Sequence, residues 1–246
     1  MTMDLPQAVT AAWAMFRRDH EVMVALAGLF LLVPSLAVLL LVPAPPPPVA
    51  ASAGEAAIEH WVDLYFTWAG ANAPVMLAGV ASSLFGALAI TVFVMDRARP
   101  SVAEAMARAL RLFPVYVVLS AGVAIVAFLG MLALVVPGLW IAGRAMLIAP
   151  SLVEEGTQPP GPVMQSLRLT RGNGLLVAGL AGIGLFGAQL AALPLLALDD
   201  ALRASMPNPI AITLVDTLIA AIEASLALAL VLIRIALYRQ ATGAAR

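Results

Sequence analysis

The chain has 246 residues, of which 63% are hydrophobic and 11% are charged, and its formal net charge is -1. Because charged residues make up roughly a quarter of an ordinary soluble domain, this composition excludes one. It predicts an all-α, polytopic membrane protein that forms a single integral domain over residues 1–246. The absence of cysteine excludes disulfides, thiolate metal sites and cysteine nucleophiles. We expect no nucleic-acid partner.

The N-terminal region combines a surface helix with a first membrane span. Apolar residues recur at helical spacing over residues 5–16, ahead of Arg17 and Arg18, which predicts an amphipathic helix on the membrane face. Residues 22–42 form an apolar run long enough to cross a hydrocarbon core of about 30 Å. This run is too long for the core of a secretory signal, although residues 51–53 resemble a cleavage site. We therefore expect a retained span, kinked at Pro34.

A proline-rich exit and an acidic segment follow the first span. Residues 43–48 are proline at five of six positions and cannot continue a helix. Over residues 55–68, acids recur every fourth position, while apolar and aromatic residues lie on another face. The two sets are Glu55, Glu59 and Asp63, and Ile58, Trp61, Tyr65 and Trp68. This separation predicts a helix lying flat at the outer interface; the alternative is an acidic site for a cation or ligand.

Five further apolar segments are candidate spans. They cover residues 74–95, 115–136, 138–152, 175–198 and 210–238. A basic amphipathic segment over residues 102–113 precedes the third span, and Pro137-Gly138 predicts a tight turn after that span. The fourth candidate is short, because about 15 residues reach only about 22 Å as a helix.

Arginine placement decides whether this short segment crosses, because cytoplasmic loops are enriched in basic residues. With six crossings and a cytoplasmic N-terminus, ten arginines are cytoplasmic, Arg203 is outside, and Arg144 and Arg234 lie in the membrane. The ten are Arg17, Arg18, Arg97, Arg99, Arg108, Arg111, Arg168, Arg171, Arg239 and Arg246. Without the fourth crossing, the last four of these would move outside. We therefore predict six spans with both termini cytoplasmic.

The middle of the chain carries the most distinctive residues. They are Ala105, Ala109, Pro137-Gly138, Arg144, Pro150, residues 154–156 and residues 166–173. In these positions the chain resembles the glycerophosphoryl diester phosphodiesterase membrane-domain family, whose relatives include YciC-like inner-membrane proteins. The resemblance implies a bacterial-type inner (plasma) membrane location. The family is named for members fused to a soluble phosphodiesterase barrel, and this chain has no segment for such a barrel, so the enzymatic name does not transfer.

A search for catalytic residues leads to the same conclusion. His20 and His60 are predicted on opposite sides of the membrane, so they cannot share a metal, and the chain has no HExxH motif. A GxSxG nucleophile elbow and a P-loop are also absent. We therefore predict a protein that is not an enzyme and has no cofactor and no metal.

Charged residues near or within the spans are the candidate site residues. Arg168 and Arg171 precede the fifth span, where arginine forks suit lipid phosphates; alternatively, they only fix the topology and extend to headgroups. Arg144 is predicted to pair inside the bundle with Glu223 or, failing that, with Asp216, because unpaired charges at that depth are costly. Such a pair either locks the fourth span to the sixth or forms a polar site that opens during transport.

Two classes of function are compatible with this sequence. In the first, the protein binds or moves lipid or another small amphiphile without covalent chemistry. In the second, it is a membrane scaffold or accessory protein that docks a protein partner, or a second copy, through its cytoplasmic amphipathic segments. A groove that is lined by Arg144, Asp216 and Glu223 and open to lipid would favour the first, and an apolar patch on a cytoplasmic face would favour the second.

Overall fold

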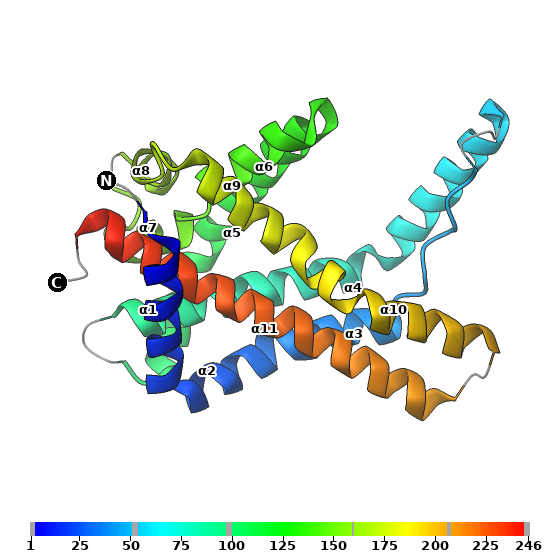
Figure 1. The fold of residues 1–246 in the computed structure, drawn as a ribbon, viewed down its shortest axis with the longest axis horizontal. Coiled ribbons are helices and arrows are strands. Elements are labelled where there is room, and N and C mark those ends of the chain that lie inside the picture. Colours follow the sequence, from blue (N-terminus) through cyan, green and yellow to red (C-terminus); the bar gives the residue numbers. More distant parts are fainter. Residues whose placement is uncertain (1–2, 51–53, 97–99, 159, 206–207, 244–246) are drawn as a thin grey trace.

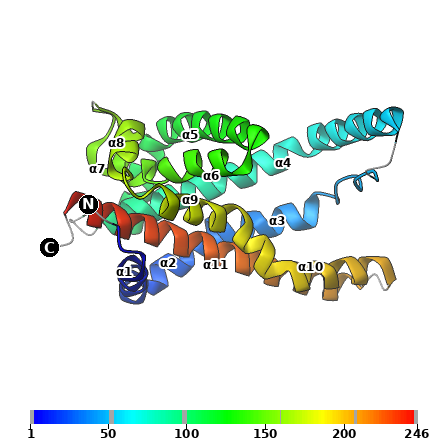
Figure 2. The same ribbon diagram turned by 45° about the horizontal axis from the view of Figure 1, so that its top comes forward.

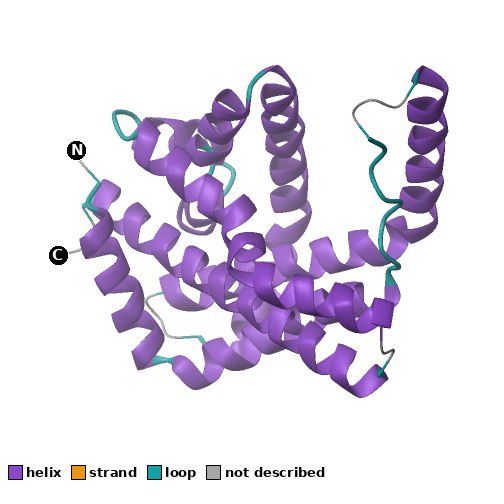
Figure 3. Cartoon of the chain, turned by 45° about the vertical axis from the view of Figure 1, so that its right-hand side comes forward, coloured by secondary structure: helices purple, strands orange, loops and turns teal. Residues whose placement is uncertain are grey.

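The computed structural model describes residues 3–50, 54–96, 100–158, 160–205 and 208–243. The secondary structure of these residues is helical, without a strand (Figures 1 and 3). Six helical segments are long and apolar enough to cross a membrane: His20–Leu41, Glu55–Met95, Val102–Ala133, Val135–Glu155, Gly174–Ser205 and Pro209–Thr242. The predicted all-α architecture with six spans is therefore confirmed.

Helix α1 (Leu5–Arg18) is the predicted surface helix, and it lies across one end of the bundle (Figure 1). The carboxylate of Asp4 caps it by accepting a hydrogen bond from Gln7 N at 2.9 Å. The buried face of α1, which packs on the last helix of the chain, consists of Ala8, Ala12 and Met15. Their spacing of three or four residues is that of one helix face.

The first span contains a change of helix type. It consists of α2 (His20–Ala27), a π-helical turn η1 (Gly28–Leu32) and α3 (Val33–Leu41). Pro34 lies in the first turn of α3, directly after η1. Because proline lacks the N–H that would donate one turn back, the irregularity expected at Pro34 takes the form of this π-helical turn.

Helix α4 (Glu55–Met95) corrects the prediction of a separate, flat interfacial helix over residues 55–68. It is continuous over 41 residues, or about 61 Å, twice the thickness of the hydrocarbon core. Its first half extends away from the bundle (Figures 1 and 2). The proline-rich exit runs beside it, since the indole Nε1 of Trp61 donates to Pro46 O at 3.3 Å and that of Trp68 to Pro43 O at 2.9 Å.

Helices α5 (Val102–Ala133), α6 (Val135–Arg144) and α7 (Ile148–Glu155) form the middle of the chain. The predicted basic segment 102–113 is not separate, because α5 continues without a break through the third span. The turn predicted at Pro137-Gly138 is also wrong. The chain reverses at Leu134, whose backbone is extended, and Pro137 lies in the first turn of α6, where proline is tolerated because that N–H has no helical acceptor.

After α7 the chain continues through the short helix α8 (Pro162–Leu169) into two long helical segments. The first consists of α9 (Gly174–Gly182), the π-helical turn η2 (Ile183–Gly187) and α10 (Ala188–Ser205). The second is α11 (Pro209–Thr242). The side chain of Asn208 caps α11 by accepting from Ile210 N at 3.0 Å. Gly243, with a φ of 70°, ends it in the left-handed conformation that glycine adopts without strain.

The core lies where α1, α7, α8 and both ends of the chain gather, which we call the terminal end of the bundle (Figure 1). Its fully buried large side chains include Met23, Leu88, Ile90, Leu147, Leu152, Ile235 and Leu237. Away from this end the helix pairs diverge (Figure 2). Apolar residues there, such as Leu132, Val136 and Leu214, are exposed, as expected of surfaces in contact with lipid tails.

The predicted topology can be tested with reporter fusions after Gln158 and at the C-terminus. Both junctions lie at the terminal end, and so does Met3, whose backbone N–H donates to Asn173 Oδ1 at 3.0 Å. With the arginine excess on that side, both fusions should report the cytoplasm. A fusion after Ser205, in the turn between α10 and α11, should report the opposite side. A periplasmic signal at either of the first two junctions would contradict the six-span topology.

Candidate functional site

Residues 144–170, which belong to the segment that carries the family resemblance, pack together at the terminal end of the bundle. The fourth span is interrupted there, because α6 ends at Arg144 and α7 begins at Ile148. A helix end leaves carbonyl and N–H groups without helical partners, and residues 145–150 are all buried. Two side chains, one in α8 and one on the residue that follows α8, bond to groups at this break, so the break is built into the fold.

Ser166 and Thr170 hold this break together. The hydroxyl of Ser166, which is fully buried, donates to Arg144 O at 2.7 Å and accepts from Leu147 N at 3.2 Å. Thr170 Oγ1 donates to Ser166 O at 2.7 Å and also reaches Arg144 O at 3.3 Å. One hydroxyl therefore satisfies the last carbonyl of α6 and the N–H that precedes α7.

Ser166→Ala is expected to lower the free energy of unfolding by about 1–3 kcal/mol, because it leaves the buried N–H of Leu147 without a partner and leaves Arg144 O with only the 3.3 Å contact to Thr170. Ser151→Ala is the matched control. Ser151 is also fully buried, but its hydroxyl has no partner among the described residues, so removing it should be neutral or stabilising. Equilibrium unfolding by sodium dodecyl sulfate, followed by circular dichroism, measures both. Equal losses in the two variants would contradict the bridging role of Ser166.

The predicted pairing of Arg144 with Glu223 or Asp216 is wrong. The guanidinium of Arg144 donates through Nη2 to Leu167 O, and its Cζ lies 5.1 Å from the ring centroid of Trp140. A backbone carbonyl and an aromatic face thus take the place of a carboxylate. Trp140 lies one turn before Arg144 on α6, and the α6–α7 break brings Arg144 to Leu167 of α8.

Each predicted acidic partner is bound elsewhere. Asp216, fully buried, accepts from Arg203 Nη2 at 2.9 Å and ties α10 to α11. Glu223 accepts from Ser35 Oγ, and from Gln189 Nε2 at 3.4 Å. These three charged residues therefore do not line one polar groove.

Arg168 and Arg171, the predicted headgroup contacts, are exposed at the terminal end. Neither guanidinium forms a hydrogen bond or ion pair within the described part of the chain. Both are therefore available to lipid phosphates, and their role as headgroup contacts stays a prediction.

A groove that sequence reasoning missed runs between α1, the first span and α11. Its volume is about 430 Å³, within the 300–1,000 Å³ typical of small-molecule sites. Ser225 supplies one hydroxyl and Trp13 one indole N–H, and the other lining residues are hydrocarbon or glycine. The lining residues are Val9, Ala12, Trp13, Phe16, Val24, Ala27, Gly28, Leu32, Ala221, Ala224, Ser225, Leu228, Ala229, Leu232 and Ile233. We call this site the α1–α11 groove.

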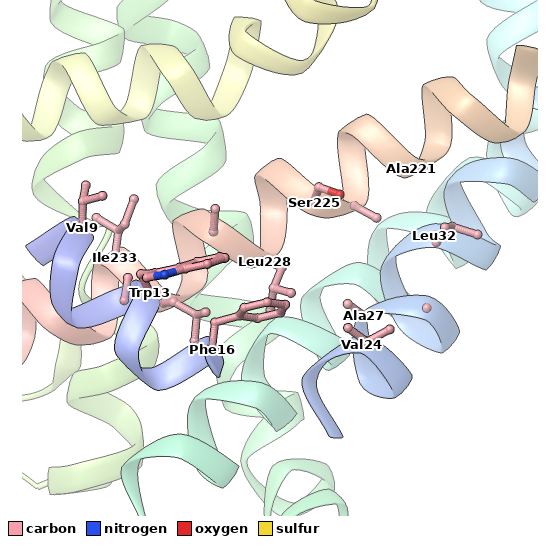
Figure 4. Close-up of a pocket in the computed structure, with 15 residues that line it drawn as sticks. Val9, Trp13, Phe16, Val24, Ala27, Leu32, Ala221, Ser225, Leu228 and Ile233 are labelled. Carbon is pink, nitrogen blue, oxygen red and sulfur yellow. The ribbon is translucent and has the colours of Figure 1, made fainter. Parts of the chain in front are cut away.

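The α1–α11 groove is open at the side of the bundle. In Figure 4, Trp13 and Phe16 of α1 extend towards Leu228 of α11, and Val24 lies across from them on α2. Trp13 is 58% exposed and Val24 55%, so the walls continue onto the outer surface. The sequence signal was a stripe of small residues on α11, namely Ala221, Ala224, Ser225 and Ala229.

The described residues offer little for catalysis. They contain no group of three or more His, Cys, Asp or Glu side chains that could hold a metal ion. His20 and His60 are both exposed on separate helices. The prediction that the protein is not an enzyme stays a prediction.

Comparison with known proteins found no matching family, no matching curated protein and no matching solved structure. The resemblance to the glycerophosphoryl diester phosphodiesterase membrane-domain family therefore stays a prediction.

Proposed function

We propose that this integral membrane protein binds the acyl chain of a lipid, or of another small amphiphile, in the α1–α11 groove without covalent chemistry. The observation that carries this proposal is an apolar groove of about 430 Å³ whose walls open onto the side of the bundle. Hydrocarbon is the ligand that such walls favour, because the walls offer few hydrogen-bond partners and an acyl chain requires none.

Two features of α1 support an amphiphile rather than a plain hydrocarbon. The helix lies across the bundle end (Figure 1), in the orientation of an interfacial helix. Arg17 follows Trp13 by one helical turn and is exposed on the same face. A ligand with its chain against Trp13 would thus have a cation beside its head.

The proposal is tested by filling the groove. Gly28 lines it, and a Cβ at this position meets no atom within 4 Å, so Gly28→Phe starts from open space and directs its ring into the groove. The control is Gly122→Phe, which is equally unobstructed but lies outside the groove on α5. Native mass spectrometry of each delipidated protein, titrated with a neutral diacylglycerol, gives the bound fraction.

Gly28→Phe should weaken diacylglycerol binding at least about tenfold, or about 1.4 kcal/mol, because its ring takes space that the acyl chain would occupy. Gly122→Phe should bind as the unmodified protein does. Unchanged binding by Gly28→Phe would overturn the proposal. Equal weakening by both variants would also do so, because the ligand would then lie on the general lipid-facing surface.

A further inference from the structure

Arg234 is a charged side chain within a candidate span, and its electrostatic neighbour is the phenol group of Tyr116 rather than a carboxylate. It lies in α11, and its guanidinium forms no hydrogen bond and no ion pair with the described residues. Its Nε is fully enclosed. Arg144 and Arg203 differ, because the first meets Leu167 O and Trp140 and the second meets Asp199 and Asp216.

This charge needs a counter-ion. A guanidinium in a protein stays protonated, and ionisable groups within a membrane normally face a partner or a wet cavity. The acids on α11 and beside its last turns have other partners or lie far along the axis. Glu155 accepts from Tyr238 Oη at 3.1 Å and from Gln165 Nε2 at 3.0 Å, whereas Glu223 lies eleven residues earlier on α11, about 16 Å away along the axis.

The guanidinium of Arg234 lies beside η2. A Cβ built on Gly184 would be 3.9 Å from Arg234 Nη2, so the missing side chain at Gly184 leaves the nitrogen facing the π-helical turn. Such turns are rare and are frequent at functional sites. Both π-helical turns of this chain pack on α11, with η1 at the α1–α11 groove and η2 at Arg234.

Arg234 lies inside the span, below the terminal end. Gln240, six residues later on α11, bonds to Asp4 at the terminal end, and six helical residues span about 9 Å. The guanidinium is beside Gly184, ten residues or about 15 Å after the start of α9. A phosphate that binds this cation therefore enters between η2 and α11, below the terminal end.

We propose that Arg234 binds the phosphate group of an anionic amphiphile or phosphate ester that approaches between η2 and α11. A guanidinium presents paired N–H donors that match two phosphate oxygens. This site is separate from the proposed acyl-chain site, because η2 does not line the α1–α11 groove. The two sites therefore can be tested independently.

The test compares three probes on the delipidated, full-length protein. They are phosphatidylglycerol, diacylglycerol with the same chains, and glycerol 1-phosphate, each titrated while the unfolding midpoint and the Kd are measured. Phosphatidylglycerol should bind at least about tenfold more tightly than diacylglycerol, a difference of about 1.4 kcal/mol. Arg234→Gln should abolish that difference, and Arg234→Lys should keep part of it as a point charge.

Controls separate this site from general surface charge and from the groove. Arg168→Gln, at an exposed arginine, should keep the preference for phosphatidylglycerol, and so should Gly28→Phe. Conversely, Arg234→Gln should bind diacylglycerol normally.

The soluble probe identifies the source of the phosphate. Stabilisation by glycerol 1-phosphate as well would identify a soluble phosphate as the source, and stabilisation by phosphatidylglycerol alone would identify a lipid headgroup.

Three results would overturn the proposal. The first is an unmodified protein that binds phosphatidylglycerol and diacylglycerol equally and ignores glycerol 1-phosphate. The second is a preference that survives in Arg234→Gln. The third is a preference that Arg168→Gln removes as completely as Arg234→Gln does. The first result is measured on the unmodified protein, so it can overturn the proposal even where a variant fails to fold.

Discussion

Gly143→Ala is expected to lower the free energy of unfolding by about 1–3 kcal/mol, although alanine is normally the better helix former. Gly143 lies in α6, where this helix packs on α9. A Cβ at this position would collide with the carbonyl group of Val177 and lie 2.7 Å from Ala178 N. Backbone atoms cannot rotate out of the way as a side chain can, so the two helices would have to separate.

Gly179→Ala is the matched control for this crossing. Gly179 is also a helical glycine, in α9, but a Cβ there meets no atom within 4 Å. Alanine should therefore be neutral or stabilise by up to about 1 kcal/mol, the difference in helix propensity. Detergent unfolding followed by circular dichroism would compare the two variants. Equal stability of Gly143→Ala and Gly179→Ala would show that α6 and α9 are not in close contact at Gly143.

The six spans could be predicted because membrane crossing depends on local properties. A run of about 20 apolar residues is visible in any window, and the surface helix α1 shows its amphipathic character in the helical spacing of apolar residues over 5–16. Within that face Ala8 and Ala12 are buried, whereas Trp13 is exposed. Neither prediction requires knowledge of which helices are neighbours. The number of spans and the helical class therefore followed from the sequence alone.

Helix continuity was less predictable, because local signals compete with tertiary contacts. Residues 55–68 have the pattern of an interfacial helix, yet α4 continues through them into the second span. Pro137-Gly138 has the composition of a turn, yet the reversal lies at Leu134 and Gly138 is buried against α5. In the first case α4 continues through Pro74 instead of ending before it, and in the second the first turn of a helix accommodates the proline.

The partner of Arg144 could not be predicted, because the prediction compared depths counted along unbroken helices. The break after Arg144 changes both its depth and its neighbours, and it depends on Ser166 and Thr170. A backbone carbonyl that becomes an acceptor at such a break has no sequence signature. The α1–α11 groove was missed for a related reason, since its walls come from both ends of the chain.

Asp216 is paired with Arg203 and not with Arg144. Arg203→Met is expected to destabilise the protein because it leaves a fully buried carboxylate without its cation. Removing one partner of a buried pair costs about 3–5 kcal/mol. Arg203 is itself 44% exposed, so solvent already screens part of the attraction, and we expect a smaller loss, about 1–3 kcal/mol.

The double variant Arg203→Met with Asp216→Leu should recover most of this loss, because the two residues are in contact and their effects are coupled. A control is Arg18→Met. Arg18 meets Asp19 at 2.6 Å, but this pair is exposed, with 52% and 27% of the side chains accessible, so its loss should stay below about 1 kcal/mol. Simple addition of the Arg203 and Asp216 effects would mean that the ion pair does not hold α10 to α11. A loss at Arg18 as large as that at Arg203 would mean that burial does not set the strength of these pairs.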